Sequence, residues 1–398
     1  MRNRTIAALI IALIPAGLIV KRHIAAPVTP ADLRDAPISE AFDQLGGGVS
    51  EDIPMPEAAP ATDPSSPASG QNGAPRPIAA IYGDDNRVDV YAANKTIRLL
   101  ADSSISLILS RNLIFDEISG NYRVETENLE TKFKLVPGHR FAKQPAAAYC
   151  SGAYVGQSKE GRPLVFTAGH CVQENGAMFA CGRDKVVFGY AVSRSGKMPS
   201  AIPAKEVFNC RVLAHRLDSV ADYALLELDR RPAGHDPLAI NRGGAIKKNT
   251  SVFVIGHPSG LPAKVAGDAV VREADIEGTR FFSSNLDTFG GNSGSPVFNE
   301  KTLMIEGILV SGRKDYDPNP AIGRRTAIWY GNSGGAERAT KISEIAAYIQ
   351  PTPIEAYLHQ RSQEIEEGLR KAPDLGLSKV RVAMPSPAAA GEQDERPI

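Results

Sequence analysis

The sequence has no excess of charge of either sign, which limits the partners it can bind. Its 398 residues include 45 lysines and arginines and 45 aspartates and glutamates, so the formal net charge at pH 7 is zero. Proteins that bind nucleic acid usually present a basic excess to the phosphate backbone. We therefore expect no nucleic-acid partner.

The sequence also lacks the residue spacings that commonly hold metal ions. It contains no CxxC or HxxxH pattern, and the adjacent acids Asp84 and Asp85 do not stand in a loop with EF-hand spacing. We interpret these two acids as part of a solvated turn. We expect no metal and no other cofactor.

The N-terminus has an uncharged run, but a short one. Residues Thr5–Val20 carry no charge and follow two arginines, as in a secretion signal. A transmembrane helix needs about 20 apolar residues, and Pro15 and Gly17 interrupt this run. No Ala-x-Ala cleavage site follows. We predict that residues 1–25 are a signal peptide or an uncleaved membrane anchor formed by residues 5–20. Either alternative makes the rest of the protein secreted or periplasmic.

The remaining chain divides by composition. Residues 26–77 are rich in Pro, Ala, Ser and Gly with little apolar periodicity, which is typical of a flexible linker or pro-segment. Ordered sequence resumes near Ile78, and we place the main domain at residues 78–350. Residues 351–398 are expected to form a C-terminal helix and a disordered tail.

Short apolar runs separated by turn residues dominate the main domain, and the chain has 36 Gly and 29 Pro. This pattern favours an all-β fold of β-barrels over alternating strands and helices. Residues 229–246, with several Gly and Pro, are the expected passage between two barrels. Residues 106–109 and 113–115 are expected to be strands that close the first barrel, and residues 340–349 show the apolar spacing of a closing helix.

One stretch, Phe289-Gly290-Gly291-Asn292-Ser293-Gly294-Ser295-Pro296-Val297, suits nucleophilic chemistry. A serine between glycines lies on a backbone that can turn tightly and present its N–H groups on one side. Acyl transfer needs a hydroxyl nucleophile beside two such donors, which bind the oxyanion of the tetrahedral intermediate. Taken alone, the stretch is equally compatible with an ordinary turn between strands.

Two further segments supply a base and an acid. Leu164–Cys171 is an apolar run that ends in small residues and His170, so this histidine is expected at the end of a strand. Asp222 opens the apolar run Asp222–Leu228, where a partly buried carboxylate is able to orient an imidazole. Each segment alone also fits a loop histidine or a turn-capping aspartate.

Together the three segments resemble the His, Asp and Ser motifs of chymotrypsin-fold (trypsin-like) serine proteases, in that chain order. The motifs are Thr167–Cys171, Asp222–Leu225 and Gly291–Pro296, and the last is closest to the bacterial glutamyl endopeptidase-like branch. The resemblance covers roughly residues 80–350. It implies two six-stranded antiparallel barrels, a C-terminal helix and a protein or peptide substrate.

The resemblance also implies roles for single residues. His170, Asp222 and Ser293 are the expected catalytic triad, and the backbone N–H groups of Gly291 and Ser293 are the expected oxyanion hole.

The chain has four cysteines, at 150, 171, 181 and 210, and an even number suits two disulfides in an exported protein. The resemblance pairs Cys150 with Cys171, which leaves Cys181 for Cys210. A zinc site made by these cysteines is the alternative.

The sequence leaves alternatives open for the pocket that selects the substrate side chain. Asp287 lies six residues before Ser293, where the family places the pocket floor, and Thr288 follows it. An acid at that floor favours Lys or Arg side chains. The alternative is that Asp287 is buried in a structural hydrogen-bond network. A preference for Glu would need a cationic wall, and the strand Glu306–Gly312 has no histidine.

Three further observations bear on function. Gly256–Pro262 contains a second histidine and a second serine, His257 and Ser259, but no strand-borne acid, so we interpret it as a family-type loop. Asn292 replaces the aspartate of digestive relatives, so activation is not expected to use an ion pair at this position. The alternative function is a non-catalytic protein-binding module on a protease fold.

Overall fold

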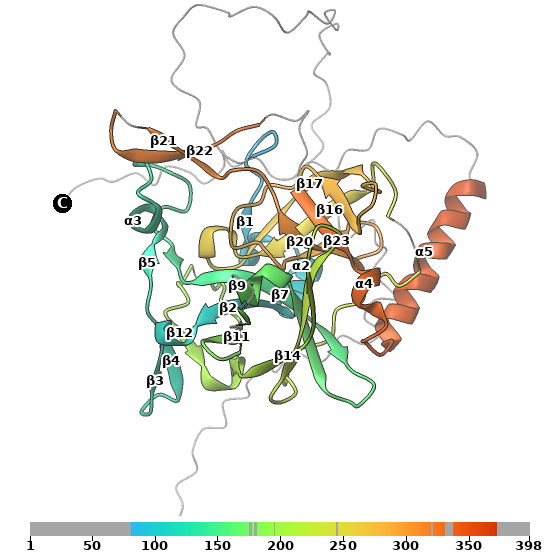
Figure 1. Ribbon diagram of the computed structural model, residues 1–398, viewed down its shortest axis with the longest axis horizontal. Coiled ribbons are helices and arrows are strands. Elements are labelled where there is room, and N and C mark those ends of the chain that lie inside the picture. The colour runs from blue at the N-terminus through green and yellow to red at the C-terminus, as the bar shows by residue number, and fades with distance from the viewer. Residues whose placement is uncertain are drawn as a thin grey trace, which may run out of the picture.

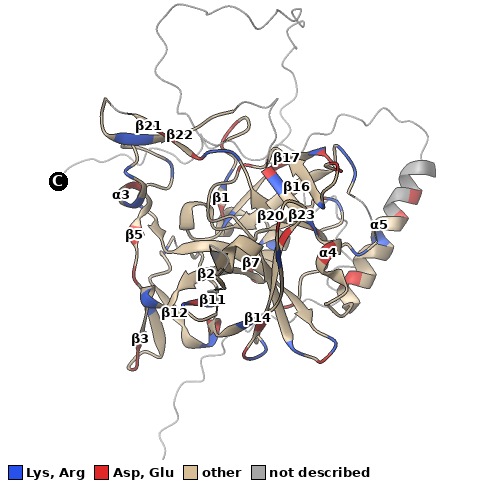
Figure 2. Cartoon of the chain, viewed as in Figure 1, with Lys and Arg blue, Asp and Glu red and all other residues tan. Residues whose placement is uncertain are grey.

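The computed structural model describes residues 81–371, except 175–176, 179–180, 195, 244–245, 320 and 331–336. The predictions for residues 1–77 and for the tail after residue 371 lie outside the described residues. Among the described residues, no helix is both long enough and apolar enough to span a membrane. Basic and acidic residues are interspersed over the whole body, in keeping with the balanced composition (Figure 2).

The first barrel is a seven-stranded antiparallel sheet in the order β13-β11-β2-β7-β8-β15-β14. In chain order these strands are β2 (Ser104–Leu109), β7 (Ala148–Gln157), β8 (Pro163–Thr167), β11 (Asp184–Phe188), β13 (Val207–Phe208), β14 (Cys210–Leu217) and β15 (Asp222–Leu228). All seven residues of β15 are buried, whereas β14 alternates between partly buried and exposed positions. Only Asn209 separates the two edge strands β13 and β14, so the sheet curls back on itself.

The second barrel is closed. Its sheet runs in the order β1-β17-β16-β19-β20-β23-β18, and β17 also pairs with β18, which completes a six-stranded ring with β1 added outside it. The strands are β1 (Val88–Asp89), β16 (Ser251–Gly256), β17 (Lys264–Glu273), β18 (Phe281–Ser284), β19 (Pro296–Asn299), β20 (Ile305–Ser311) and β23 (Glu337–Lys341). The predicted all-β, chymotrypsin-like double barrel is therefore confirmed (Figure 1).

Smaller elements surround the barrels. A separate three-stranded sheet consists of β3 (Leu113–Asp116), β4 (Asn121–Val124) and β12 (Ala201–Pro203). Among the described residues there are also two-stranded sheets, which pair β5 (Glu127–Asn128) with β6 (Pro145–Ala146), β9 (Gln173–Glu174) with β10 (Ala177–Met178), and β21 (Tyr316–Asn319) with β22 (Arg324–Ala327). The short helices are α2 (Lys95–Ala101), α3 (Leu129–Phe133), η1 (Val90–Ala92), η2 (Ser110–Asn112), η3 (Gly169–Cys171), η4 (Ala204–Glu206) and η5 (Pro258–Gly260).

Two strand and helix predictions were wrong in part. Residues 106–109 do belong to the first barrel, but residues 113–115 form β3 in the separate sheet, where Ile114 and Phe115 are exposed. The predicted helix at 340–349 begins too early, because Thr340 pairs with Phe281 in the second barrel and only α4 (Ser343–Ala346) is helical. The last helix, α5 (Pro353–Lys371), agrees with prediction and packs through Leu358 against Met304.

The segment before the first barrel packs on the second. β1 pairs with β17, and Lys264 Nζ lies 2.7 Å from a carboxylate oxygen of Asp89. Arg87 is 1% exposed, forms a 2.8 Å ion pair with Asp85, and places its guanidinium carbon 4.1 Å from the ring centre of Phe289. Buried charges therefore hold this segment beside the loop that precedes the predicted nucleophile.

Candidate active site

His170 lies just beyond the end of β8, within η3. The chain reaches this position because Leu164–Thr167 is a buried strand, and the Thr167 hydroxyl donates to the carbonyl oxygen of Ser151 at 2.7 Å. The side chain of His170 is 36% exposed, so its ring is accessible from solvent.

Asp222, the first residue of β15, holds the histidine. Its Oδ2 lies 2.7 Å from His170 Nδ1, and its Oδ1 accepts hydrogen bonds from the backbone N–H groups of Gly169 and His170. Because a carboxylate only accepts, the proton must be on Nδ1 of the neutral ring, which leaves Nε2 as an acceptor. The Thr340 hydroxyl of the second barrel donates to the backbone oxygen of Asp222, so both barrels fix this residue.

Ser293 follows a tight turn near the end of the loop that joins β18 to β19 in the second barrel. Asn292 N–H donates to Phe289 O at 2.9 Å, and Gly291 has a φ of 98°, which a glycine adopts without strain. Gly294 has a φ of 88°, and a Cβ atom there would lie 2.1 Å from Ser151 O and 2.3 Å from the Thr167 hydroxyl. The serine segment can pass this close to the end of β8 only because residue 294 has no side chain.

The structure brings the backbone of Ser293 against the histidine segment. Ser151 N–H donates to Ser293 O at 2.8 Å, and Cys171 Sγ lies 3.7 Å from the same oxygen. In the part of the chain that the structure describes, no hydrogen bond joins Ser293 Oγ to the His170 ring. Such bonds are often long in enzymes without substrate.

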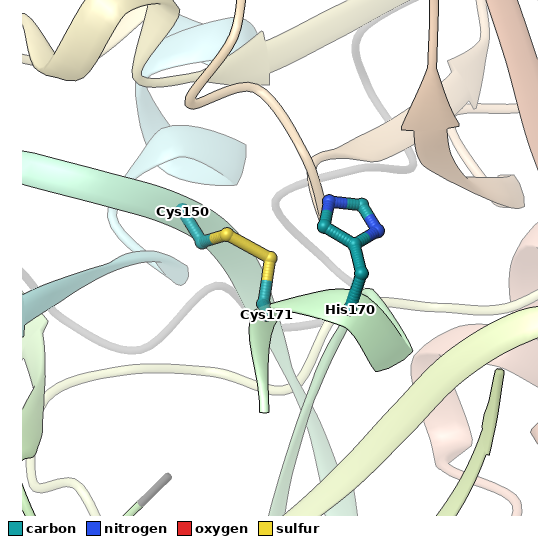
Figure 3. A group of neighbouring side chains, drawn as sticks. All are labelled: Cys150, His170 and Cys171. Atoms are coloured by element: carbon teal, nitrogen blue, oxygen red, sulfur yellow. A yellow bond between two sulfur atoms is a disulfide. The ribbon is translucent and has the colours of Figure 1, made fainter. Parts of the chain in front are cut away.

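Both disulfides are present. Cys150 is bonded to Cys171, and Cys181 to Cys210, in the pairing that the resemblance implied. The sulfur atoms of Cys150 and Cys171 and a ring nitrogen of His170 lie within 4.8 Å of one another (Figure 3). Because the two sulfurs are bonded to each other, neither is a thiolate that would bind zinc.

Asp287 is placed in a hydrogen-bond network. Its side chain is buried, its Oδ1 accepts from Tyr82 N–H at 2.8 Å, and its Oδ2 accepts from Asn86 N–H at 3.3 Å. Burial raises the pKa of Asp287 to about 7. Both oxygens are therefore engaged with the segment that precedes the first barrel, which is the structural alternative considered for this residue.

Thr288 contacts a second buried acid, Glu337, which the sequence did not predict to be part of the site. Its hydroxyl donates to Glu337, which also accepts from the Tyr82 hydroxyl at 3.1 Å and from Arg313 N–H at 3.2 Å. Burial raises the pKa of Glu337 to about 7. No motif marks Glu337, because only the pairing of β23 with β20 and β18 brings it to Thr288.

Ser151 is a second residue that sequence reasoning did not assign. Its hydroxyl accepts from His257 N–H at 2.9 Å and donates to Gly291 O at 2.7 Å. Its position directly after Cys150, which the resemblance pairs with Cys171 beside the predicted catalytic histidine, was the available signal.

Comparisons with known proteins match part of this chain to a family model. Residues 150–308 match the family model described as the trypsin-like peptidase domain. No curated protein matches the chain. Similar solved structures include the Rv3671c protease of M. tuberculosis in its active form, at 16% identity over 73% of this chain and 100% of that one with a TM-score of 0.35. An inactive form of the same protease matches at 16% identity, over 64% of this chain and 90% of that one, with a TM-score of 0.33.

Proposed function

We propose that this protein is a serine endopeptidase whose catalytic triad is Ser293, His170 and Asp222. The observation that carries the proposal is the 2.7 Å contact between His170 Nδ1 and Asp222 Oδ2, which leaves Nε2 free to accept a proton. The match of residues 150–308 to a peptidase domain supports it. The glycines around Ser293 supply the backbone that an oxyanion hole needs.

The proposed reaction proceeds by acyl transfer. Ser293 Oγ attacks the carbonyl carbon of the scissile peptide while its proton passes to His170 Nε2, and Asp222 stabilises the imidazolium. The N–H groups of Gly291 and Ser293 bind the oxyanion. The imidazolium then protonates the leaving amine, and an acyl ester on Ser293 remains. Water, deprotonated by His170, hydrolyses the ester and regenerates the enzyme.

For specificity we propose a preference for Lys or Arg. Two buried acids adjoin Thr288: Asp287 precedes it in the chain, and Glu337 accepts a hydrogen bond from its hydroxyl. Negative charge at this position favours a cationic side chain. Against a simple charge pair, both acids already accept hydrogen bonds. A peptide library tests this: cleavage after Lys or Arg supports the preference, whereas cleavage only after Glu favours the glutamyl endopeptidase-like branch.

The second candidate is a binding module without catalysis. It is favoured by one observation, which is that Ser293 Oγ and the His170 ring share no hydrogen bond among the described residues. A fluorophosphonate probe separates the two functions, because only an activated serine is modified.

The decisive experiment uses Ser293→Ala. We expect the wild-type protein to hydrolyse a peptide substrate and to carry the fluorophosphonate on Ser293, as read by mass spectrometry. Ser293→Ala should lose both properties and keep its melting temperature. Ser119→Ala, at an exposed turn of the β3–β4 hairpin, is the matched control and should behave like the wild type. Undiminished turnover by Ser293→Ala would exclude Ser293 as the nucleophile.

We also propose that the protein acts in the periplasm or outside the cell. Two disulfides are typical of an oxidising compartment. The domain division at residues 25, 77 and 350, and membrane attachment through residues 5–20, stay predictions. Mass spectrometry of the protein from its native compartment reports the mature N-terminus and tests the first two boundaries.

A further inference from the structure

The Gly256–Pro262 loop, which the proposed mechanism does not use, contacts the peptide that carries an oxyanion donor. Ser259 N–H donates to Gly290 O at 2.6 Å. Gly290 O and Gly291 N–H belong to the same peptide group, and all described peptide bonds are trans. In a trans peptide the carbonyl and the N–H point in opposite directions. The bond from Ser259 therefore fixes the direction of the Gly291 N–H.

The backbone N–H of Gly290 is also hydrogen-bonded. It donates to Asp315 Oδ2 at 2.7 Å. Asp315 is partly buried, and burial raises its pKa to about 6, so it is mostly a carboxylate at neutral pH. A charged acceptor makes a stronger hydrogen bond to an N–H than a neutral one does. Both polar groups of Gly290 are thus engaged, from two different loops.

Tyr316 links these two loops. Its phenol oxygen lies 2.6 Å from Ser259 Oγ in a buried hydrogen bond, and its ring centre lies 5.4 Å from that of Phe289. Ser259 has a φ of 54°, a left-handed conformation that is strained for a non-glycine residue. Strained backbone of this kind persists only where the surroundings hold it. The bond to Tyr316 is such a restraint.

The base of the loop is fixed separately. His257 is buried, its Nδ1–H donates to Leu261 O at 3.0 Å, and its N–H donates to Ser151 Oγ at 2.9 Å. Burial lowers the pKa of His257 to about 4, so the ring is neutral at pH 7 and brings no charge beside the serine segment. Ser151 in turn donates to Gly291 O, so the peptide after Gly291 is restrained too.

From this geometry we infer that Ser259, Tyr316 and Asp315 form a clamp, here called the Gly290 clamp, that keeps the Gly291 N–H turned toward the developing oxyanion. The inference rests on the proposed function. The three residues are positioning residues, because none of them touches the reacting atoms. If the Gly290–Gly291 peptide flipped, its carbonyl oxygen would replace the donor and repel the oxyanion.

The test compares Asp315→Asn and Tyr316→Phe with the wild type. Loss of a whole oxyanion donor lowers kcat by about 10²- to 10³-fold, so a loosened donor should lower kcat by roughly 10-fold. KM should change by less than about 2-fold, because the clamp acts on the transition state. Affinity for a peptide boronic acid, whose adduct places an oxygen in the oxyanion hole, should fall in parallel with kcat.

The matched control is Asp317→Asn on the same hairpin. Asp317 is exposed and pairs with Lys314 at 2.6 Å, so this variant should keep the wild-type kcat and boronate affinity. Ser259→Ala removes the same hydrogen bond as Tyr316→Phe but keeps the Ser259 N–H. The double variant should therefore be no worse than either single variant.

The outcomes separate the clamp from the mechanism. A wild-type protein that a fluorophosphonate does not label would overturn the proposed function and the clamp with it. A labelled wild type with unchanged kcat in Asp315→Asn and Tyr316→Phe would overturn the clamp alone. A fall in kcat accompanied by an equal change in KM and a lower melting temperature would also overturn it, because that pattern reports general loosening of the fold.

Discussion

Replacing Asp222 by Asn tests the orientation of His170 with one atom changed. In the structure, Asp222 Oδ1 accepts from the N–H groups of Gly169 and His170, and Oδ2 accepts from His170 Nδ1. An asparagine can keep its oxygen on the two backbone donors. Its amide nitrogen then faces Nδ1 and must donate to it. The ring proton is thereby moved to Nε2, where it would block the transfer from Ser293 that the proposed mechanism requires.

The expected effects on activity and stability are very different. Forcing the wrong tautomer lowers kcat by on the order of 10⁴-fold, or about 5.5 kcal/mol of transition-state stabilisation. Because the backbone hydrogen bonds persist, the free energy of unfolding should change by no more than about 1 kcal/mol. An activity loss that greatly exceeds the stability loss is the signature of tautomer control.

The assay measures kcat and KM on a peptide amide, with urea denaturation of the same samples. Asp229→Asn, at the opposite end of β15 and paired with Arg230 at the surface, is the control and should retain wild-type kcat. A loss in kcat below 10-fold for Asp222→Asn would show that Asp222 does not orient the base. A drop in stability of several kcal/mol would show that the backbone bonds had also been lost.

Two more predictions concern stability. The pKa of Asp287 is raised to about 7 in the folded protein, so its contribution to stability is present below pH 4 and is lost as the pH rises to 7. Relative to Asp287→Asn, the free energy of unfolding of the wild type should fall by up to about 4 kcal/mol over this pH range, as measured by urea titration. If the free energies of unfolding of the two proteins depend on pH in the same way, the burial argument is contradicted. Replacing both Cys181 and Cys210 by Ser opens a loop with a sequence separation of 29. This should lower the free energy of unfolding by about 3.5 kcal/mol while leaving kcat intact, and an unchanged unfolding midpoint would refute it.

Local patterns predicted the parts of the site that depend on local structure. His170 follows an apolar run and Asp222 opens another, and β8 and β15 lie at these two runs. The turn around Ser293 follows from its glycines, and Gly291 and Gly294 do have positive φ. These features needed no information from distant residues.

Features that depend on distant pairings were beyond sequence reasoning. Asp287 is held by Tyr82 and Asn86, about 200 residues earlier, and no periodicity indicates that contact. Thr340 was predicted to be helical because the apolar residues after it have helical spacing, yet its pairing with Phe281 in the barrel outweighs that local preference. The sequence assigned no role to the Gly256–Pro262 loop, because its contact with Gly290 is made by backbone atoms, which side-chain identities do not reveal.

The attachment of residues 81–89 to the second barrel has a consequence for biosynthesis. This segment leaves the ribosome before both barrels, and its partners Lys264 and Asp287 are translated some 175 to 205 residues later. At typical elongation rates the interval is about 10 to 40 s. During that time Arg87, which is buried in the folded protein, and the partly buried Asp89 have no second barrel to pack against. The contacts of residues 81–89 with the second barrel therefore form only after these partners have emerged, late in the synthesis of the domain.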